Sequence, residues 1–250
     1  MAALRVIPCL DIDDGRVVKG VRFSGLRDAG DPVVSARAYE YQGADEIVLL
    51  DVSATPQGRA HGLGIVDSVR RVLSIPLTVG GGVRQVEDAS RLLEAGADKI
   101  GVNTAAVSRP ALITEMSGRF GAQCTVLAVD AARSCGGWEV VVESGRHPTG
   151  LDVVEWCQKA VSAGAGEILL TSWDRDGTGD GYDLELIEAV SAVVDVPVIA
   201  SGGASGTGHM IEAFRSGASA ALVASILHDG VSTVSEIKRE LLAAGLEVRP

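Results

Sequence analysis

Two aspartates occupy matching positions in the two halves of the sequence. Asp11 follows the apolar run LRVIPCL (4–10), and Asp130 ends the run CTVLAVD (124–130), 119 residues later. If the two runs form strands that face each other, these carboxylates can act as general acid and general base on a molecule between them. A single aspartate at such a place is often only a helix cap, but its recurrence favours a catalytic pair.

Glycine-rich turns also recur, as GGGV (80–83) and SGGA (201–204), 121 residues apart. Glycine lets a backbone approach an anion closely, and the start of a following helix supplies N–H donors. One such turn is explained by backbone conformation alone, whereas two related turns predict a ligand with a phosphate at each end. We expect its contacts to come from Gly82, Asn103, Thr104, Asp176, Gly177, Gly203 and Ser225.

Two further segments are expected near this site. DRDGTGDGYD (174–183) is too polar for a core and too rich in glycine for a helix, and its spacing does not match a calcium-binding EF-hand loop. KGVRFSGLRDAGDP (19–32) is read either as a lid that carries Lys19 or as a solvated loop.

Four charged residues stand at the opposite ends of predicted strands: Arg5, Glu46, Lys99 and Glu167. Near the interior of a sheet they would have to pair with one another. From spacing alone, separate and solvated strand ends are the preferred interpretation.

The histidines and cysteines suggest neither a metal site nor a disulfide framework. No shared face links the histidines, so we expect each to be a surface or structural residue: His61, His147, His209 and His228. No CxxC pair or zinc-ligand spacing links the cysteines, which we expect to be reduced thiols: Cys9, Cys124, Cys135 and Cys157.

Short apolar runs alternate with amphipathic helical patterns along the whole chain. Eight runs rich in Val, Ile and Leu are expected to be buried parallel strands: 4–10, 46–52, 76–80, 98–103, 124–130, 167–172, 197–201 and 218–225. Glycines in QGAD, EAGAD, SAGAG and RSGAS are expected to end the helices before the strands that follow. This order predicts an α/β fold, a (β/α)8 TIM barrel, with residues 1–250 as a single domain.

The sequence also repeats internally. YQGADEIVLLDVS (41–53) aligns with SAGAGEILLTSWD (162–174), and IPLTVGGGVRQVEDA (75–89) aligns with VPVIASGGASGTGHM (196–210), both at an offset of 121 residues. We therefore predict two half-barrels, about residues 1–120 and 121–250, related by a pseudo-twofold axis. Such an axis would place Asp11 and Asp130 on opposite sides of the barrel mouth.

Composition and charge exclude several classes of protein. The 250 residues contain 22 Lys and Arg against 33 Asp and Glu, a formal net charge of −11, which argues against a general nucleic-acid binder or a basic membrane-surface protein. Acidic residues interrupt the N-terminal apolar stretch, and no uncharged run reaches the roughly 18 residues of a membrane span. We expect a cytoplasmic protein.

Taken together, the motifs resemble the cyclase subunit family of imidazole glycerol phosphate synthase, in histidine biosynthesis. The similarity covers essentially the whole chain, and two of its segments are closer to the cyclase than to its sister isomerase. These are the opening CLDIDDGRVVKG (9–20) and the loop SWDRDGTGDGYD (172–183). The segment SATPQGR (53–59) and Trp173 depart from the family pattern but touch none of its catalytic matches.

The resemblance implies a reaction and roles for the residues above. Ammonia attacks the ribulosyl carbonyl of a bisphosphorylated aminoimidazole carboxamide intermediate, giving imidazole glycerol phosphate and an aminoimidazole carboxamide ribotide. Asp11 and Asp130 match the acid–base pair, with the assignment of acid and base left open. The reaction implies neither a cofactor nor a metal.

The resemblance also reverses the interpretation of the four charged strand ends. Arg5, Glu46, Lys99 and Glu167 match a gate at the barrel floor through which ammonia enters. The ammonia implies a separate glutaminase subunit docked on the N-terminal face of the barrel, with Asp98 facing it.

Three other functions remain open. The sister isomerase would use the same two aspartates for an aldose-to-ketose rearrangement. A non-catalytic barrel that binds a phosphorylated ligand would not need both carboxylates. A structural partner that only stimulates the glutaminase is the third.

Overall fold

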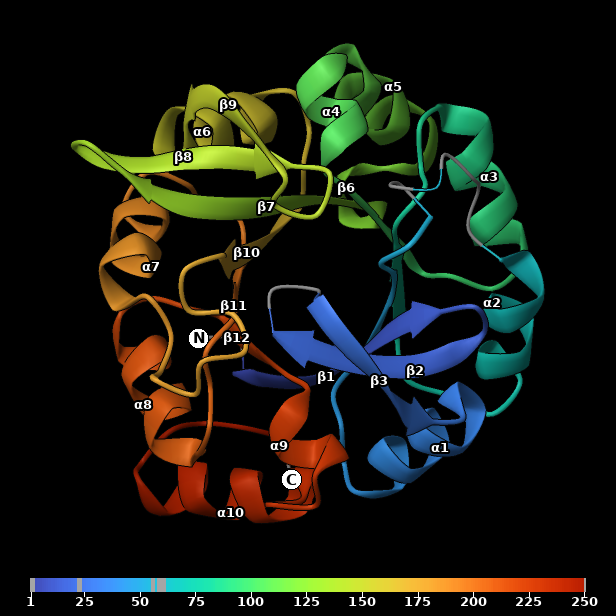
Figure 1. Cartoon of the computed structure of the whole chain (residues 1–250), viewed down its shortest axis with the longest axis vertical. Coiled ribbons are helices and arrows are strands. Elements are labelled where there is room, and N and C mark those ends of the chain that lie inside the picture. The colour runs from blue at the N-terminus through green and yellow to red at the C-terminus, as the bar shows by residue number, and fades with distance from the viewer. Residues whose placement is uncertain (1–2, 22–23, 55–56, 58–61, 250) are drawn as a thin grey trace.

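Eight parallel strands close into a barrel surrounded by helices (Figure 1). The computed structural model describes residues 3–21, 24–54, 57 and 62–249. The barrel strands, in chain order, are β1 (Arg5–Asp13), β4 (Ile47–Asp51), β5 (Leu77–Gly80), β6 (Lys99–Val102), β7 (Thr125–Ser134), β10 (Glu167–Ser172), β11 (Val198–Ser201) and β12 (Ala220–Val223). Parallel pairing of β7 with β10 and of β12 with β1 completes the ring. The predicted (β/α)8 barrel is confirmed.

Successive residues of each strand face opposite sides of the barrel wall, which explains why the runs are apolar throughout. Val6 and Leu10 of β1 pack outward against the helices. Ile7 and Cys9 belong to a second buried cluster, inside the barrel. The other fully or largely buried members of this inner cluster are Val48, Val126, Leu169, Ile199, Ala220 and Leu222.

The helices of the described chain cover the outside of the barrel. They are α1 (Pro32–Tyr41), α2 (Leu63–Arg70), α3 (Val86–Glu94), α4 (Thr104–Ser108), α5 (Ala111–Phe120), the 3-10 turn η1 (Ala122–Cys124), α6 (Val153–Ser162), α7 (Leu184–Ser191), α8 (Thr207–Arg215), α9 (Ser225–His228) and α10 (Val234–Ala243). None of them is both long and apolar enough to cross a membrane.

Helix boundaries follow the signals expected from the sequence. Asp31 begins α1 by accepting hydrogen bonds from the N–H groups of Val33 and Val34, with Pro32 in the first turn. The predicted stop glycines lie two residues beyond α1, α3, α6 and α8, and all have the left-handed backbone that ends a helix: Gly43, Gly96, Gly164 and Gly217.

Two antiparallel hairpins extend the barrel at its C-terminal face. β2 (Arg16–Val21) pairs with β1 and β3 (Ser24–Gly30), and β8 (Gly137–Val142) pairs with β7 and β9 (His147–Asp152). The described residues of segment 19–32 form β2, β3 and the start of α1, so the solvated loop is wrong for them, and the lid stays a prediction. The sequence signal for the first hairpin is the turn Asp14–Gly15, because both residues have positive φ, as a tight hairpin turn requires.

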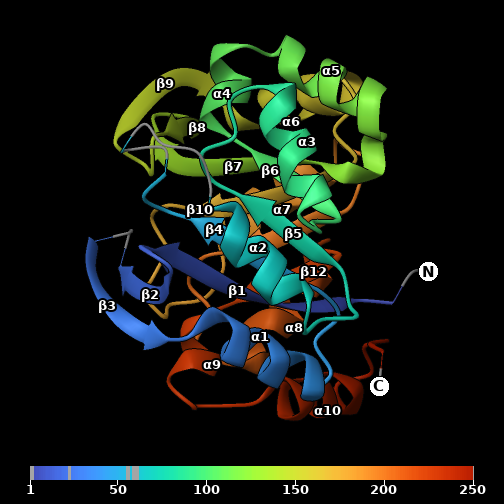
Figure 2. The same cartoon turned by 90° about the vertical axis from the view of Figure 1, so that its right-hand side faces the viewer.

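The described ends of the chain meet on the face opposite the hairpins (Figure 2). Leu4 donates a backbone hydrogen bond to Glu247, and it pairs with Val248. Lys238 of α10 forms a fully buried ion pair with Asp45, whose other oxygen accepts the N–H of Val6. The last helix is thereby fastened to the first strand.

Candidate active site

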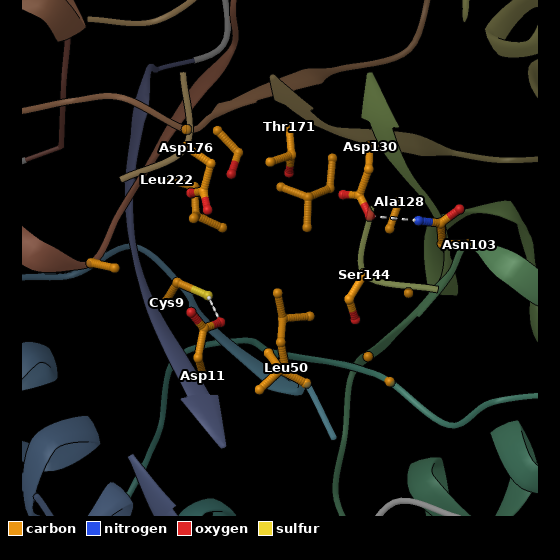
Figure 3. Close-up of a pocket in the computed structure, with 18 of the residues that line it drawn as sticks. Cys9, Asp11, Leu50, Asn103, Ala128, Asp130, Ser144, Thr171, Asp176 and Leu222 are labelled. Carbon is orange, nitrogen blue, oxygen red and sulfur yellow. Dashed lines mark hydrogen bonds between the residues drawn. The ribbon is translucent and has the colours of Figure 1, made fainter. Parts of the chain in front are cut away.

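A cavity of about 730 Å³ opens at the carboxyl ends of the barrel strands (Figure 3). The catalytic and phosphate-binding residues predicted from the sequence all line it: Asp11, Lys19, Gly82, Asn103, Thr104, Asp130, Asp176, Gly177, Gly203 and Ser225. This is the end of a TIM barrel at which active sites form.

Asp11 lies half-buried near the end of β1, level with Leu50 of the neighbouring strand. The thiol of Cys9 donates a 3.5 Å hydrogen bond to its Oδ1. Loss of contact with water, followed by repulsion from Asp176, raises the pKa of Asp11 to about 7, and the thiol only partly offsets this.

Asp130 occupies the corresponding place on β7, level with Thr171. The side-chain amide of Asn103 donates a 3.0 Å hydrogen bond to its Oδ2. Desolvation raises the pKa of Asp130 to about 7, repulsion from Asp176 and Asp11 adds to the increase, and the Asn103 hydrogen bond opposes it.

The two aspartates stand on opposite sides of the cavity. β7 is the fourth strand from β1 in either direction around the barrel, so the two carboxylates face each other across the mouth, as Figure 3 shows. With both pKa values near neutrality, one carboxyl group can hold a proton while the other is ionised. This arrangement is suited to moving protons on both sides of a bound molecule.

The glycine turns have the same backbone in both halves. Gly81 and Gly82 have φ values of 94° and 72°, and their counterparts Gly202 and Gly203 have 92° and 98°. A side chain at Gly81 would collide with the carbonyl of Asp51, and one at Gly202 would meet the carbonyl of Ser172, 121 residues later. Only glycine fits these close approaches.

The residues that begin the short helices after β6 and β12 also match. Asn103 precedes α4 with φ −126° and ψ −91°, and Ala224 precedes α9 with φ −132° and ψ −78°. Thr104 and Ser225 therefore occupy equivalent first positions, each beside its glycine turn and each at the cavity. The predicted repeat thus extends to uncommon backbone angles.

Lys19 projects into the cavity from β2, and Asp229 pairs with it. The Lys19 side chain is buried, and its ammonium group forms an ion pair with Oδ1 of Asp229, which also accepts from Arg27 at 3.1 Å. Asp229 was not predicted. Neither its type nor its spacing indicates that Asp229, just after α9, contacts β2, which lies some 200 residues earlier in the chain.

Other cavity residues were missed because their types are unremarkable in sequence. Cys9, Ser144 and Thr171 line the cavity with Asp11 and Asp130. For Cys9 and Thr171 the alternation of a strand gives a usable signal, because Cys9 is two residues from Asp11 and Thr171 is two from the inward-facing Leu169. Ser144 lies in a turn and carries no such signal.

The four charged strand ends form a closed ring at the floor of the barrel. Arg5 contacts Glu46 at 3.2 Å and Glu167 at 2.5 Å, and Lys99 contacts the same two carboxylates at 2.8 and 2.7 Å. Thr78 donates a further hydrogen bond to Glu46. The expectation from spacing alone, separate solvated charges, is wrong because the barrel curvature brings the four side chains together. The inner apolar cluster lies between this ring and the cavity.

The histidines in the described ranges take surface or structural places. His228 accepts from the Tyr39 hydroxyl through Nδ1 at 2.6 Å and donates through Nε2 to the Cys9 carbonyl at 3.1 Å. Its burial lowers its pKa. His147 is exposed, His209 accepts the N–H of Ser205, and His61 lies outside the described residues.

Asp98 lies on the same side of the barrel as the charged ring, near the start of β6. Asp98 is half-exposed near the floor, where it accepts hydrogen bonds from Arg70 and from the N–H of Leu77. All four cysteines are free thiols. Among the described residues, no cluster of His, Cys, Asp or Glu is arranged to hold a metal ion.

Comparison with known proteins agrees with this geometry. The family model of the histidine biosynthesis protein matches residues 5–233. The imidazole glycerol phosphate synthase subunits HisF of Synechococcus sp. (strain CC9902) and Beutenbergia cavernae are both 56% identical to this chain, over 100% and 99% of each protein. That of Mycobacteroides abscessus is 54% identical over 99% of both chains. The chain therefore belongs to the histidine biosynthesis protein family, among the HisF subunits of imidazole glycerol phosphate synthase.

Proposed function

We propose that this chain is the cyclase subunit of imidazole glycerol phosphate synthase. It would join ammonia to the ribulosyl carbonyl of a bisphosphorylated aminoimidazole carboxamide and release imidazole glycerol phosphate and aminoimidazole carboxamide ribotide. The observation that carries the proposal is the pair of opposed carboxyl groups, Asp11 and Asp130, each with a pKa near 7 in one cavity.

The chemistry requires proton transfer on both sides of the reacting carbon. Condensation of ammonia with the carbonyl forms an imine and releases water, and closure of the ring is followed by cleavage of a C–N bond. One aspartic acid donates a proton to the departing oxygen or nitrogen, while the opposed aspartate accepts one from the attacking nitrogen. Either residue can take either role, and the roles exchange between steps.

The two glycine turns are proposed to hold the two phosphates. Gly82, Asn103 and Thr104 would bind one, and Gly177, Gly203 and Ser225, with Asp176 beside them, would bind the other. Their matched backbone angles support this, because two equivalent cradles suit a ligand with two equivalent ends. Lys19 supplies a positive charge to the cavity.

The ring of Arg5, Glu46, Lys99 and Glu167 is proposed to be the gate for ammonia. Its ion pairs occupy the barrel floor, so admission of a molecule requires one of them to open. The apolar layer above it would accept neutral ammonia and disfavour ammonium, whose charge is costly to bury. We propose a glutaminase subunit docked on this face as the source, with Asp98 at the contact.

We also propose that the chain is a single domain and that it acts in the cytoplasm. Residues 1–250 form one domain, since β12 closes on β1 and α10 is fastened to the first strand. The chain acts in the cytoplasm, consistent with its free thiols.

The decisive experiment uses the purified chain, the ribulosyl bisphosphate intermediate and an ammonium salt at alkaline pH. Loss of substrate absorbance and identification of products by mass spectrometry report turnover. Imidazole glycerol phosphate as product supports the cyclase. Conversion of the ribosyl precursor into the ribulosyl compound, without cyclisation, would instead identify the sister isomerase. Inactivity on both substrates would leave a binding barrel.

A further inference from the structure

The turn between β8 and β9 brings two residues with unfavourable backbone angles to the cavity. Glu143 and Ser144 have φ values of 53° and 57°, and both line the cavity. In the described chain only one other non-glycine residue, Asp14, has a positive φ, and it lies away from the cavity. Left-handed angles at such residues persist where the surrounding structure imposes them, and they concentrate at functional sites.

Contacts from three directions hold this turn. The hydroxyl of Thr104, at the start of α4, accepts the N–H of Glu143 at 3.1 Å. The Trp173 ring packs so closely against Gly145 that a side chain there would collide with it. His147 contacts the Glu143 carboxylate at 3.4 Å. The turn is therefore positioned by α4, by the segment after β10 and by its own hairpin.

The turn lies next to Asp130. Val141, three residues before Ser144, is the residue of β8 that pairs with Asp130. Figure 3 shows Ser144 on the side of the cavity that carries Asp130 and Asn103. Within the described chain the Ser144 hydroxyl is not engaged in a hydrogen bond, although its neighbours Thr104 and Glu143 are. The hydroxyl is thus available to a bound molecule.

We propose that Ser144 is a substrate-binding residue, whose hydroxyl makes a hydrogen bond to an oxygen of the polyhydroxylated sugar-derived chain beside Asp130. This rests on the cyclase proposal for the identity of the substrate. The strained turn keeps the hydroxyl at one place, so the substrate carbon next to that oxygen is held within reach of the Asp130 carboxyl group. The Thr104 hydroxyl acts as a positioning group for the turn, in addition to its place at the glycine cradle.

Two substitutions distinguish the contribution of the Ser144 hydroxyl from that of the strained backbone. Ser144→Ala removes the hydroxyl and keeps the strain, whereas Ser144→Gly removes both, because glycine adopts positive φ freely. We expect each to raise KM, and the Kd of the ribulosyl bisphosphate measured by calorimetry, by about tenfold, the effect of one lost hydrogen bond. Wild-type Kd in both variants, or wild-type Kd in the glycine variant alone, would overturn the proposal.

Asp14→Gly is the matched control, because it relieves a positive φ of 45° outside the cavity. It should leave Kd and KM unchanged, and thermal unfolding should show that all three variants are folded. The Kd comparison separates this inference from the cyclase proposal. If the wild type binds the substrate without turnover, only the cyclase proposal fails. If it does not bind, both fail.

Discussion

The side-chain amide of Asn103 donates a 3.0 Å hydrogen bond to Asp130, whereas Asp11 across the cavity accepts a longer one, of 3.5 Å, from the thiol of Cys9. A hydrogen bond to the ionised form stabilises it, so the amide holds the pKa of Asp130 below the value that burial and neighbouring charges would otherwise impose. The two carboxyl groups thus reach similar pKa values through different partners.

Removing that amide should move one ionisation in the pH profile. In Asn103→Ala the pKa of Asp130 rises further, because the ionised carboxylate loses a hydrogen bond that favours it. The profile of kcat/KM against pH, measured for wild type and variant, should show one limb displaced to higher pH. A profile that only falls in height would mean that Asn103 acts solely in binding.

Substitution of Asp176 should shift the pKa values of Asp11 and Asp130 in the opposite direction. Its negative charge raises the pKa of both Asp11 and Asp130. Asp176→Asn removes this repulsion, favours both ionised forms and lowers both pKa values. Both limbs of the pH profile should move toward acid, with the substrate Kd measured in parallel because Asp176 is also proposed to lie beside a phosphate. Displacement of one limb alone would contradict the shared influence.

Neutralising either catalytic candidate should stop the chemistry but not the binding. Asp11→Asn and Asp130→Asn keep the size of the side chain and abolish its proton transfer, so we expect kcat to fall about 10²- to 10⁴-fold. The Kd of the ribulosyl bisphosphate should change little. Rates like those of the wild type in either variant would refute the acid–base assignment.

The same raised pKa values predict a dependence of stability on pH. Above pH 4 the unfolded chain loses the proton of an aspartate that the folded chain retains to about pH 7, so the native state loses stability across this window. Asp130→Asn removes the contribution of Asp130 and leaves that of Asp11. The variant should therefore gain stability relative to wild type at pH 8, by up to about 4 kcal/mol, and gain none below pH 4. Urea unfolding at both pH values measures the difference.

The buried ion pairs should differ in their sensitivity to substitution. Lys238→Met leaves Asp45 without its only cationic partner among the described residues, and we expect a loss of about 3–5 kcal/mol. Lys99→Met should cost less, because Glu46 and Glu167 both retain Arg5. Urea unfolding of the two variants at pH 7 gives the comparison, and an equal or larger loss for Lys99→Met would contradict it.

The barrel was predictable because its signals are local and repeated. Apolar runs and stop glycines such as Gly43 and Gly164 each report on their own surroundings, and the offset of about 120 residues indicated that Asp11 and Asp130 face each other. The hairpins were missed because polar residues of β2 and β3 read as loop. Their strand character depends on pairing with β1, which no short window of sequence contains.

Contacts between side chains from distant strands and loops were the least predictable part of the site. Spacing alone could not show that Arg5 and Lys99 meet the same two glutamates, because this depends on barrel curvature. The pairing of Lys19 with Asp229 and the position of Ser144 depend likewise on how loops return to the mouth.

The packing of Trp173 against Gly145 has a spectroscopic consequence. The chain contains three tryptophans, of which Trp156 lies buried in α6, away from the cavity lining. Trp138 stacks beneath Arg133 on the β7–β8 hairpin. Trp173 packs against the turn that carries Ser144. Two of the three indoles thus adjoin the one hairpin that reaches the cavity from β7. Occupation of the site should alter their intrinsic fluorescence, so the unlabelled protein provides its own optical reporter of ligand binding.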